Sequence, residues 1–189
     1  MTATIKTLPH YFPEIFAQRV ILSALIFVAL CVLWAVLYKR KRIQTKQFIV
    51  LLILSFYVVI LYYYTVVGRY SSEMHRNQIY VFYSYRDLFE DFNAESIRQI
   101  VINIVMLIPI GLLCPIIFER TGRKYIWTMI TAGIITISIE VLQVVMVCGT
   151  FEADDIINNL LGATIGIILY RIAAGIVKKH KASKGNHYE

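Results

Sequence analysis

The sequence is poor in charged residues. Only 16% of its 189 residues are Asp, Glu, Lys or Arg, whereas 58% are hydrophobic. The hydrophobic residues form long blocks between charge clusters, without the alternation of a half-buried strand or the periodicity of an amphipathic helix. A soluble core could not absorb such blocks, so the composition excludes a soluble globular domain.

Cysteine and histidine are also scarce. Cys31, Cys114 and Cys148 and the four histidines have no spacing typical of a disulfide framework or a zinc site. The sequence also lacks a nucleophile elbow, a phosphate-binding loop and a dinucleotide fingerprint. We therefore predict no metal site and no cofactor, and the pattern argues mildly against an enzyme.

Five apolar blocks have the length of membrane spans. About 20 residues of α-helix cross a hydrocarbon layer of roughly 30 Å, inside which a chain must satisfy its own backbone hydrogen bonds. The blocks cover residues 20–38, 48–67, 100–118, 126–147 and 156–177. We predict an all-α integral membrane bundle of five helices that forms one membrane domain over residues 1–189. The polar start is unlike a cleavable signal peptide.

Basic residues indicate the orientation, because they gather in two loops and the carboxyl-terminal tail. The members are Lys39, Arg40, Lys41, Arg42 and Lys46, then Arg120, Arg123 and Lys124, then Lys178, Lys179, Lys181 and Lys184. Loops with excess Lys and Arg are cytoplasmic. Five crossings put these regions on one side only if the amino terminus is outside and the carboxyl terminus cytoplasmic. Topology thus explains the net charge of +7, and no nucleic-acid partner is expected.

Polar residues gather near the predicted outer ends of the helices. An ionisable group in hydrocarbon costs several kcal/mol unless it is paired or protonated, which makes Glu140 a candidate functional residue. Gln143 lies on the same helix face, and only eight residues, 148–155, connect this helix to the next. The predicted polar pocket consists of Arg69, Asn103, Glu140, Gln143, Glu152, Asp155 and Asn159. Arg98 is also expected to approach the acidic helix ends.

Small residues predict close helix packing. Gly162 and Gly166 form a GxxxG pattern, which lets another helix approach the backbone. The short connection makes the fourth span the expected partner. Pro109 and Gly111 are expected to loosen the third span.

The roles of the polar residues stay open at this stage. They could hydrogen-bond the helices together, bind a lipid head group or an ion, or transfer protons. The aromatic segment 68–99 could be an interfacial loop or a lid over a substrate.

Three stretches carry a family resemblance: INIVMLIPIGLLCPIIF, SIEVLQ and GTFEADDIINNLLGATIG. They resemble the VanZ-like family of bacterial multi-pass membrane proteins over about residues 48–177, with the best match at 100–170. The chain has Glu152 where the family usually has aspartate, and it lacks the proline of the family's stretch before the third span. The resemblance implies a cell-membrane protein whose best-known member lowers susceptibility to teicoplanin-type glycopeptides.

The leading hypothesis is a non-enzymatic envelope protein that interacts with membrane lipids. Its outer polar pocket would bind a lipid-linked cell-wall precursor or a lipid-tailed glycopeptide antibiotic. One alternative is an intramembrane enzyme, with Glu140 and Asp155 as acid and base and Arg69 or Arg98 as a phosphate clamp. Another is a proton-coupled carrier that uses Glu140. The sequence leaves the oligomeric state open.

The orientation can be tested with reporter fusions. Fusions at Thr45, Arg123 and Ser183 should read cytoplasmic, because the basic loops are retained inside. Fusions near Glu90 and Thr150 should read external. A cytoplasmic signal at Glu90 would overturn this topology.

Overall fold

A computed structural model describes residues 8–67, 81–82, 84–86 and 94–185. These residues belong to two compact units, 1–72 and 73–189, and each unit is described by itself. The expectation of one membrane domain stays a prediction.

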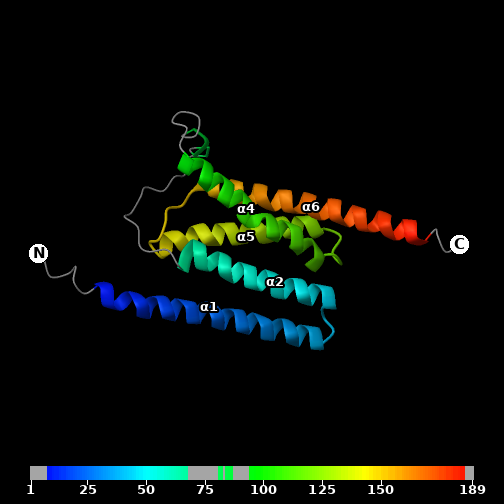
Figure 1. The fold of residues 1–189 in the computed structure, drawn as a ribbon, viewed down its shortest axis with the longest axis horizontal. Helices are drawn as coiled ribbons and strands as arrows, with labels where there is room; N and C mark the ends of the chain where they lie inside the picture. Colours follow the sequence, from blue (N-terminus) through cyan, green and yellow to red (C-terminus); the bar gives the residue numbers. More distant parts are fainter. Residues whose placement is uncertain (1–7, 68–80, 83, 87–93, 186–189) are drawn as a thin grey trace, which may run out of the picture. The chain divides into compact units, whose positions relative to one another are not determined.

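The first unit is an antiparallel helical hairpin (Figure 1). It consists of α1 (Leu8–Lys39), α2 (Thr45–Tyr62) and η1 (Tyr63–Val67), a π-helical turn that follows α2 directly. The indole N–H of Trp34 donates a 2.8 Å hydrogen bond to the Ser55 hydroxyl. This bond gives a buried serine a partner between two helices of almost wholly apolar sequence.

Further contacts hold the two helices of the first unit along their length. The rings of Phe27 and Phe56 meet edge to face at 5.6 Å between centroids. Near the far end, the Arg19 guanidinium donates a 2.8 Å hydrogen bond to the carbonyl of Val67. Val67 is the last residue of the π-helical turn, where carbonyls lack an intrahelical partner, and this arginine supplies a donor.

The described residues of the second unit include three long helices, α4 (Ala94–Ile117), α5 (Lys124–Val145) and α6 (Ala153–Gly185). In Figure 1, α4 and α6 run in the same direction, and α5 runs in the opposite direction beside them. The most extensive contact is between α4 and α6. This parallel pair therefore forms the centre of the unit.

Within the part of the chain that the structure describes, five helices are long and apolar enough to cross a membrane. They are Ala17–Lys39, Thr45–Val67, Ala94–Ile117, Lys124–Val145 and Ala153–Lys181. Large apolar side chains point outward, whereas polar side chains such as Glu140 and Asn159 are buried. This is the reverse of a soluble protein, and it confirms the predicted all-α membrane fold with five spans. The orientation of the termini stays a prediction.

The glycine residues lie where two helix backbones touch. A side-chain carbon at Gly162 would overlap the carbonyl oxygen of Ile104, and one at Gly166 would overlap that of Ile108. From the other side, a carbon at Gly111 would overlap the carbonyl oxygen of Ala163. Only glycine permits so close an approach at these three positions.

The expected partner of the glycine face was wrong. Gly162 and Gly166 meet α4, the third span, and not the fourth span, α5. The short connection before α6 makes α5 a neighbour of α6, but it does not determine which face of α6 packs against α5. Helix α4 offers its own glycine, Gly111, so the smallest faces of α4 and α6 pack together. Pro109 lies inside α4, which continues as a helix past it.

The glycine contact can be tested by substitution. Gly162→Leu and Gly166→Leu should each lower the midpoint of thermal unfolding in detergent and the folded yield, because overpacking costs at least about 1–3 kcal/mol. Gly175→Leu is a matched control on α6, since nothing lies within 4 Å of a side-chain carbon there. Equal stability of all three variants would contradict the contact.

Candidate functional site

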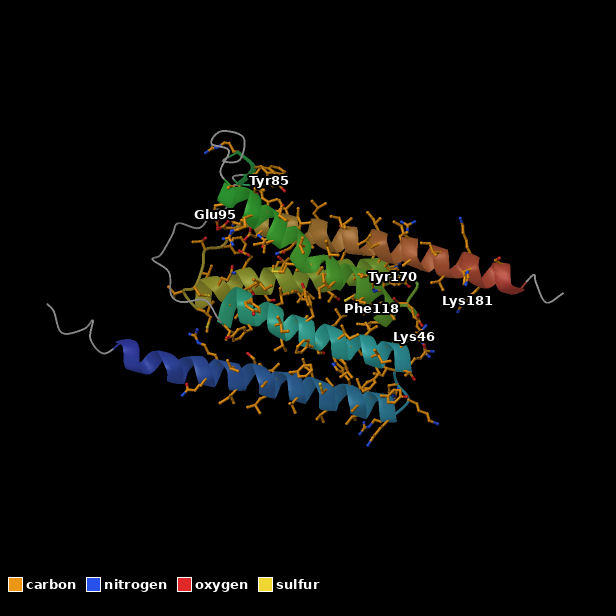
Figure 2. The ribbon with its side chains drawn as sticks, in the orientation of Figure 1. Lys46, Tyr85, Glu95, Phe118, Tyr170 and Lys181 are labelled. Atoms are coloured by element: carbon orange, nitrogen blue, oxygen red, sulfur yellow. The ribbon has the colours of Figure 1, made fainter. Side chains whose placement is uncertain are left out.

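Buried polar side chains concentrate at one end of the second unit. This acidic end is the region where α4 and α6 begin and α5 ends, and Figure 2 labels Tyr85 and Glu95 there. Its buried polar residues are Ser84, Asn103, Thr136, Glu140, Gln143, Asp154, Asn158 and Asn159. Buried charges require hydrogen-bond partners, so each buried carboxylate here should have hydrogen-bond donors beside it.

Asp154 fixes the segment that precedes α4. One carboxylate oxygen accepts the backbone N–H of Phe82 at 2.5 Å, and the other accepts that of Ser84 at 2.8 Å. Asp154 is only 2% exposed, and it lies in the first turn of α6, where the helix dipole favours negative charge. A single side chain thus ties the backbones of Phe82 and Ser84 to the start of α6.

Tyr85 adds a second tie one turn farther along α6. Its hydroxyl donates a 2.5 Å hydrogen bond to the side-chain carbonyl of Asn158. Burial raises the pKa of Tyr85, and the negative charge of Asp154 raises it further, so the phenol stays a donor at neutral pH. The Tyr85 ring also meets the Phe82 ring at 5.9 Å. Phe82 has a φ of 68°, an uncommon conformation for a bulky residue that these contacts hold.

The carboxylate of Glu140 links α5 to the connection before α6. It accepts the backbone N–H of Glu152 at 2.9 Å and is 2% exposed. The Glu152 carboxylate in turn accepts the Gln99 amide at 2.6 Å and the Thr150 hydroxyl at 3.1 Å. The same Gln99 amide lies 3.4 Å from a carboxylate oxygen of Asp155. Residues from α4, α5 and the start of α6 are joined in one network.

A deeper layer lies one helical turn farther along. The Asn159 side-chain amide donates a 2.8 Å hydrogen bond to the hydroxyl of Thr136, and both residues are almost fully buried. Gln99 faces Asp155 across the α4–α6 contact, so one turn on, Asn103 comes to the level of Asn159. Carboxamides from both helices therefore gather at this depth.

Three of these buried carboxamides have unused hydrogen-bonding capacity. The side-chain nitrogens of Asn103 and Asn158 and the side-chain oxygen of Asn159 find no partner among the residues that the structure describes. Asn158 and Asn159 are at most 1% exposed, and Asn103 is 8% exposed. An unsatisfied buried polar atom costs about 1–3 kcal/mol, so each of the three requires an explanation.

Six of the seven predicted pocket residues lie among the described residues. Glu140, Glu152 and Asp155 share the network described above, and Asn103 and Asn159 belong to the deeper layer. Gln143 is buried, and its backbone carbonyl accepts the N–H of Cys148 at the end of α5. The seventh, Arg69, lies outside the described residues. A ligand-binding role for the set stays a prediction.

The expectation for Arg98 was wrong. Its guanidinium contacts Glu95, one turn away on α4, and both side chains are more than 60% exposed. Successive helical residues point about 100° apart, so the next residue, Gln99, faces the carboxylates while Arg98 faces away from them. A neutral amide, not a cation, thus reaches Glu152 and Asp155 from α4.

Several residues of the acidic end were not among those predicted for the pocket. They are Tyr85, Gln99, Thr136, Asp154 and Asn158. The spacing of four between Asp154 and Asn158 places both on one helix face, which was a usable signal. No pattern in the sequence places Tyr85 beside Asn158, because that contact depends on how the preceding loop folds.

The comparisons with known proteins agree with this architecture. The model of the VanZ/LLP1 family matches residues 48–174, about two thirds of the sequence. The chain belongs to the VanZ/LLP1 family. This confirms the predicted family and a multi-pass bacterial membrane protein, and the matched region is close to the predicted 48–177.

One curated relative of the VanZ/LLP1 family shows the degree of divergence. Protein VanZ of Enterococcus faecium is 28% identical to the chain over 91 residues, which are 47% of this chain and 52% of that protein. The match thus spans about half the length of the relative. No solved structure matches the chain significantly.

The Asp154 contacts give a stability prediction. Asp154→Asn should lower the free energy of unfolding by about 1–3 kcal/mol, because an amide has one acceptor oxygen and would turn its N–H₂ toward a backbone donor. Thermal unfolding in detergent measures the change. Glu95→Gln, at an exposed ion pair of the same end, should leave the midpoint unchanged. A loss no larger than that of Glu95→Gln would refute the role of Asp154 as an anchor.

Proposed function

We propose that this VanZ/LLP1-family protein binds the polar head of a lipid-linked envelope molecule at its acidic end. The ligand is a lipid-linked cell-wall precursor or a lipid-tailed glycopeptide, and binding lowers susceptibility to teicoplanin-type antibiotics. The observation that carries the proposal is the set of buried, incompletely paired carboxamides of Asn103, Asn158 and Asn159.

The chemistry of the carboxamides suits such a head group. Each carboxamide can donate two hydrogen bonds and accept two, as required to bind sugar hydroxyls and peptide groups. Their spare atoms are of both kinds, two donors and one acceptor. A ligand that supplies the missing partners would recover the desolvation cost these atoms incur in the free protein.

The surroundings of the carboxamides support a site that a lipid can reach. In the proposed orientation the acidic end faces the outer leaflet, where lipid-linked precursors and antibiotic tails are exposed. Large apolar side chains such as Val101, Val105 and Leu161 are exposed beside it and provide a path for acyl chains. The segment fixed by Asp154 and Tyr85 lies over the start of α6 and would contact the head group.

The bonding of Glu140 favours binding over catalysis. Its carboxylate holds the N–H of Glu152 and so shapes the connection that carries the second carboxylate. This is a positioning role, which needs no substrate proton. An enzyme that uses Glu140 and Asp155 as acid and base would instead leave a chemically altered lipid, which distinguishes the alternatives.

The carboxylates provide the first functional test. Glu140→Gln and Asp155→Asn should abolish protection of a susceptible host against a lipid-tailed glycopeptide while the protein remains inserted at normal abundance, because each amide keeps the size but loses an acceptor oxygen. Growth at graded drug concentrations, with membrane abundance measured in parallel, gives the result. Glu95→Gln is the matched control. Full protection by both variants would leave the residues with a packing role only.

Asn103 allows a sharper test, because stability and function should change in opposite directions. Asn103→Leu removes a buried donor without a described partner, so thermal stability should be unchanged or higher, whereas protection should be lost. Thr131→Val is the control, since that hydroxyl donates an exposed hydrogen bond to the carbonyl of Trp127 in its own helix. A variant that protects fully, or one that loses stability and protection together, would contradict a ligand-binding role.

A further inference from the structure

The loop between α1 and α2 closes α1 in a defined way. The N–H of Lys41 donates to the carbonyl of Tyr38 at 2.9 Å, and the N–H of Arg42 donates to that of Leu37 at 3.0 Å. These two bonds form a Schellman motif, in which the residue after the helix adopts a left-handed backbone. The motif satisfies the carbonyls of Leu37 and Tyr38, so these two do not face an incoming anion as free acceptors.

Lys41 occupies the left-handed position of this motif, with a φ of 54°. Glycine is the usual residue there, because a side chain at positive φ is strained. A lysine at this position therefore costs stability relative to glycine. A strained residue of this kind points to a role for its side chain beyond the fold.

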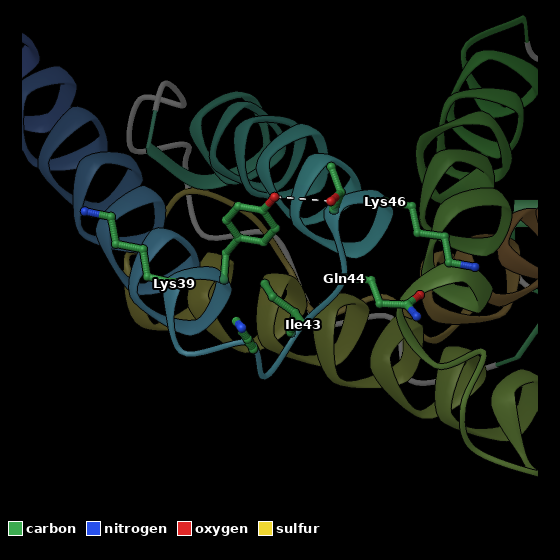
Figure 3. Close-up of a pocket in the computed structure, with 7 residues that line it drawn as sticks. Lys39, Ile43, Gln44 and Lys46 are labelled. Carbon is green, nitrogen blue, oxygen red and sulfur yellow. Dashed lines mark hydrogen bonds between the residues drawn. The ribbon is translucent and has the colours of Figure 1, made fainter.

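Lys41 lines an open depression beside the loop, with a volume of about 730 Å³. The complete lining consists of Tyr38, Lys39, Lys41, Ile43, Gln44, Thr45 and Lys46. Three of these residues are lysines and none is acidic. Figure 3 shows Lys39 and Lys46 on opposite sides of the hydrogen bond between the Tyr38 and Thr45 hydroxyls, which is 3.2 Å long.

Other features of the depression also favour an anion. Helix α2 begins at Thr45, so the positive end of its dipole lies at the lining. The Tyr38 ring is stacked on Phe48 at 4.9 Å, which holds one wall in place. No ion pair is recorded for Lys39 or Lys41 within the described residues, so their charges are not neutralised there.

We propose that this depression binds the phosphate head group of an anionic glycerophospholipid. The lysines around the depression attract the phosphate through their positive charge, and the Tyr38 and Thr45 hydroxyls offer hydrogen bonds to the glycerol oxygens. The acyl chains would lie along the exposed apolar surfaces of α1 and α2, which include Leu33, Val36 and Ile49. That apolar continuation favours a lipid over free phosphate. The site is independent of the function proposed for the acidic end.

The test compares two pairs of cations in the same loop. Lys39 and Lys41 line the depression, whereas Arg40 and Arg42 do not. The double variants Lys39→Gln/Lys41→Gln and Arg40→Gln/Arg42→Gln remove the same amount of positive charge. They therefore weaken equally the positive charge that keeps this loop on the cytoplasmic side in the predicted orientation. Purified full-length protein in nonionic detergent is titrated with phosphatidylglycerol, with phosphatidylcholine and with inorganic phosphate. Native mass spectrometry measures the retained lipid.

The wild type should retain phosphatidylglycerol in preference to phosphatidylcholine. The lysine pair should lose at least about tenfold in apparent affinity, and the arginine pair less than about threefold. Equal losses in the two pairs would show diffuse attraction and overturn the site. Equal retention of phosphatidylcholine, or displacement of the lipid by inorganic phosphate at a comparable concentration, would overturn the lipid assignment.

Lys41→Gly separates binding from folding. Glycine suits the left-handed backbone, so the midpoint of thermal unfolding should be unchanged or higher while phosphatidylglycerol retention falls. Full retention by this variant would show that the lysine is not part of the site, and a lower unfolding midpoint would show that it serves the fold.

Discussion

The second unit depends on the contact between the backbones of α4 and α6. Three glycines, Gly111, Gly162 and Gly166, remove the side chains that would otherwise separate the two helices. In a membrane there is little hydrophobic driving force between helices, so close packing supplies much of their association energy. The contact also sets the register at which the two helices meet. The polar network is built on that register.

The consequence for the acidic end is a fixed alignment of side chains. Because α4 and α6 run in the same direction with their glycines in contact, Gln99 reaches Glu152 and Asp155, and Asn103 stands at the depth of Asn159. A shift of one residue along either helix would rotate these side chains by about 100° and separate them. Packing at the glycines and chemistry at the carboxamides are therefore coupled, although the two lie at different depths.

Composition was sufficient to predict the five spans, because an apolar block of about 20 residues has few other uses. The buried carboxylate Glu140 was also predictable, since a charge inside a span always needs a partner. The helix faces that meet could not be predicted. The connection before α6 indicated α5 as the partner of Gly162, whereas the structure shows α4. The wrong placement of Arg98 has the same origin, because face assignment depends on a helix rotation that periodicity in a uniformly apolar block does not define.

The unpaired carboxamides have an energetic implication for the unit. Three buried atoms that have no partner among the described residues, at about 1–3 kcal/mol each, amount to a large part of the 5–15 kcal/mol by which a typical domain is stable. Leucine in place of Asn103 would remove the energetic cost of one such atom and would pack equally well in an apolar helix. The stability of the unit alone therefore does not explain an asparagine at this position. The glycine contact between α4 and α6 is what allows the bundle to tolerate this cost, because it binds the helices together without using side-chain polar groups. The polar atoms that packing leaves unused are then available to a ligand.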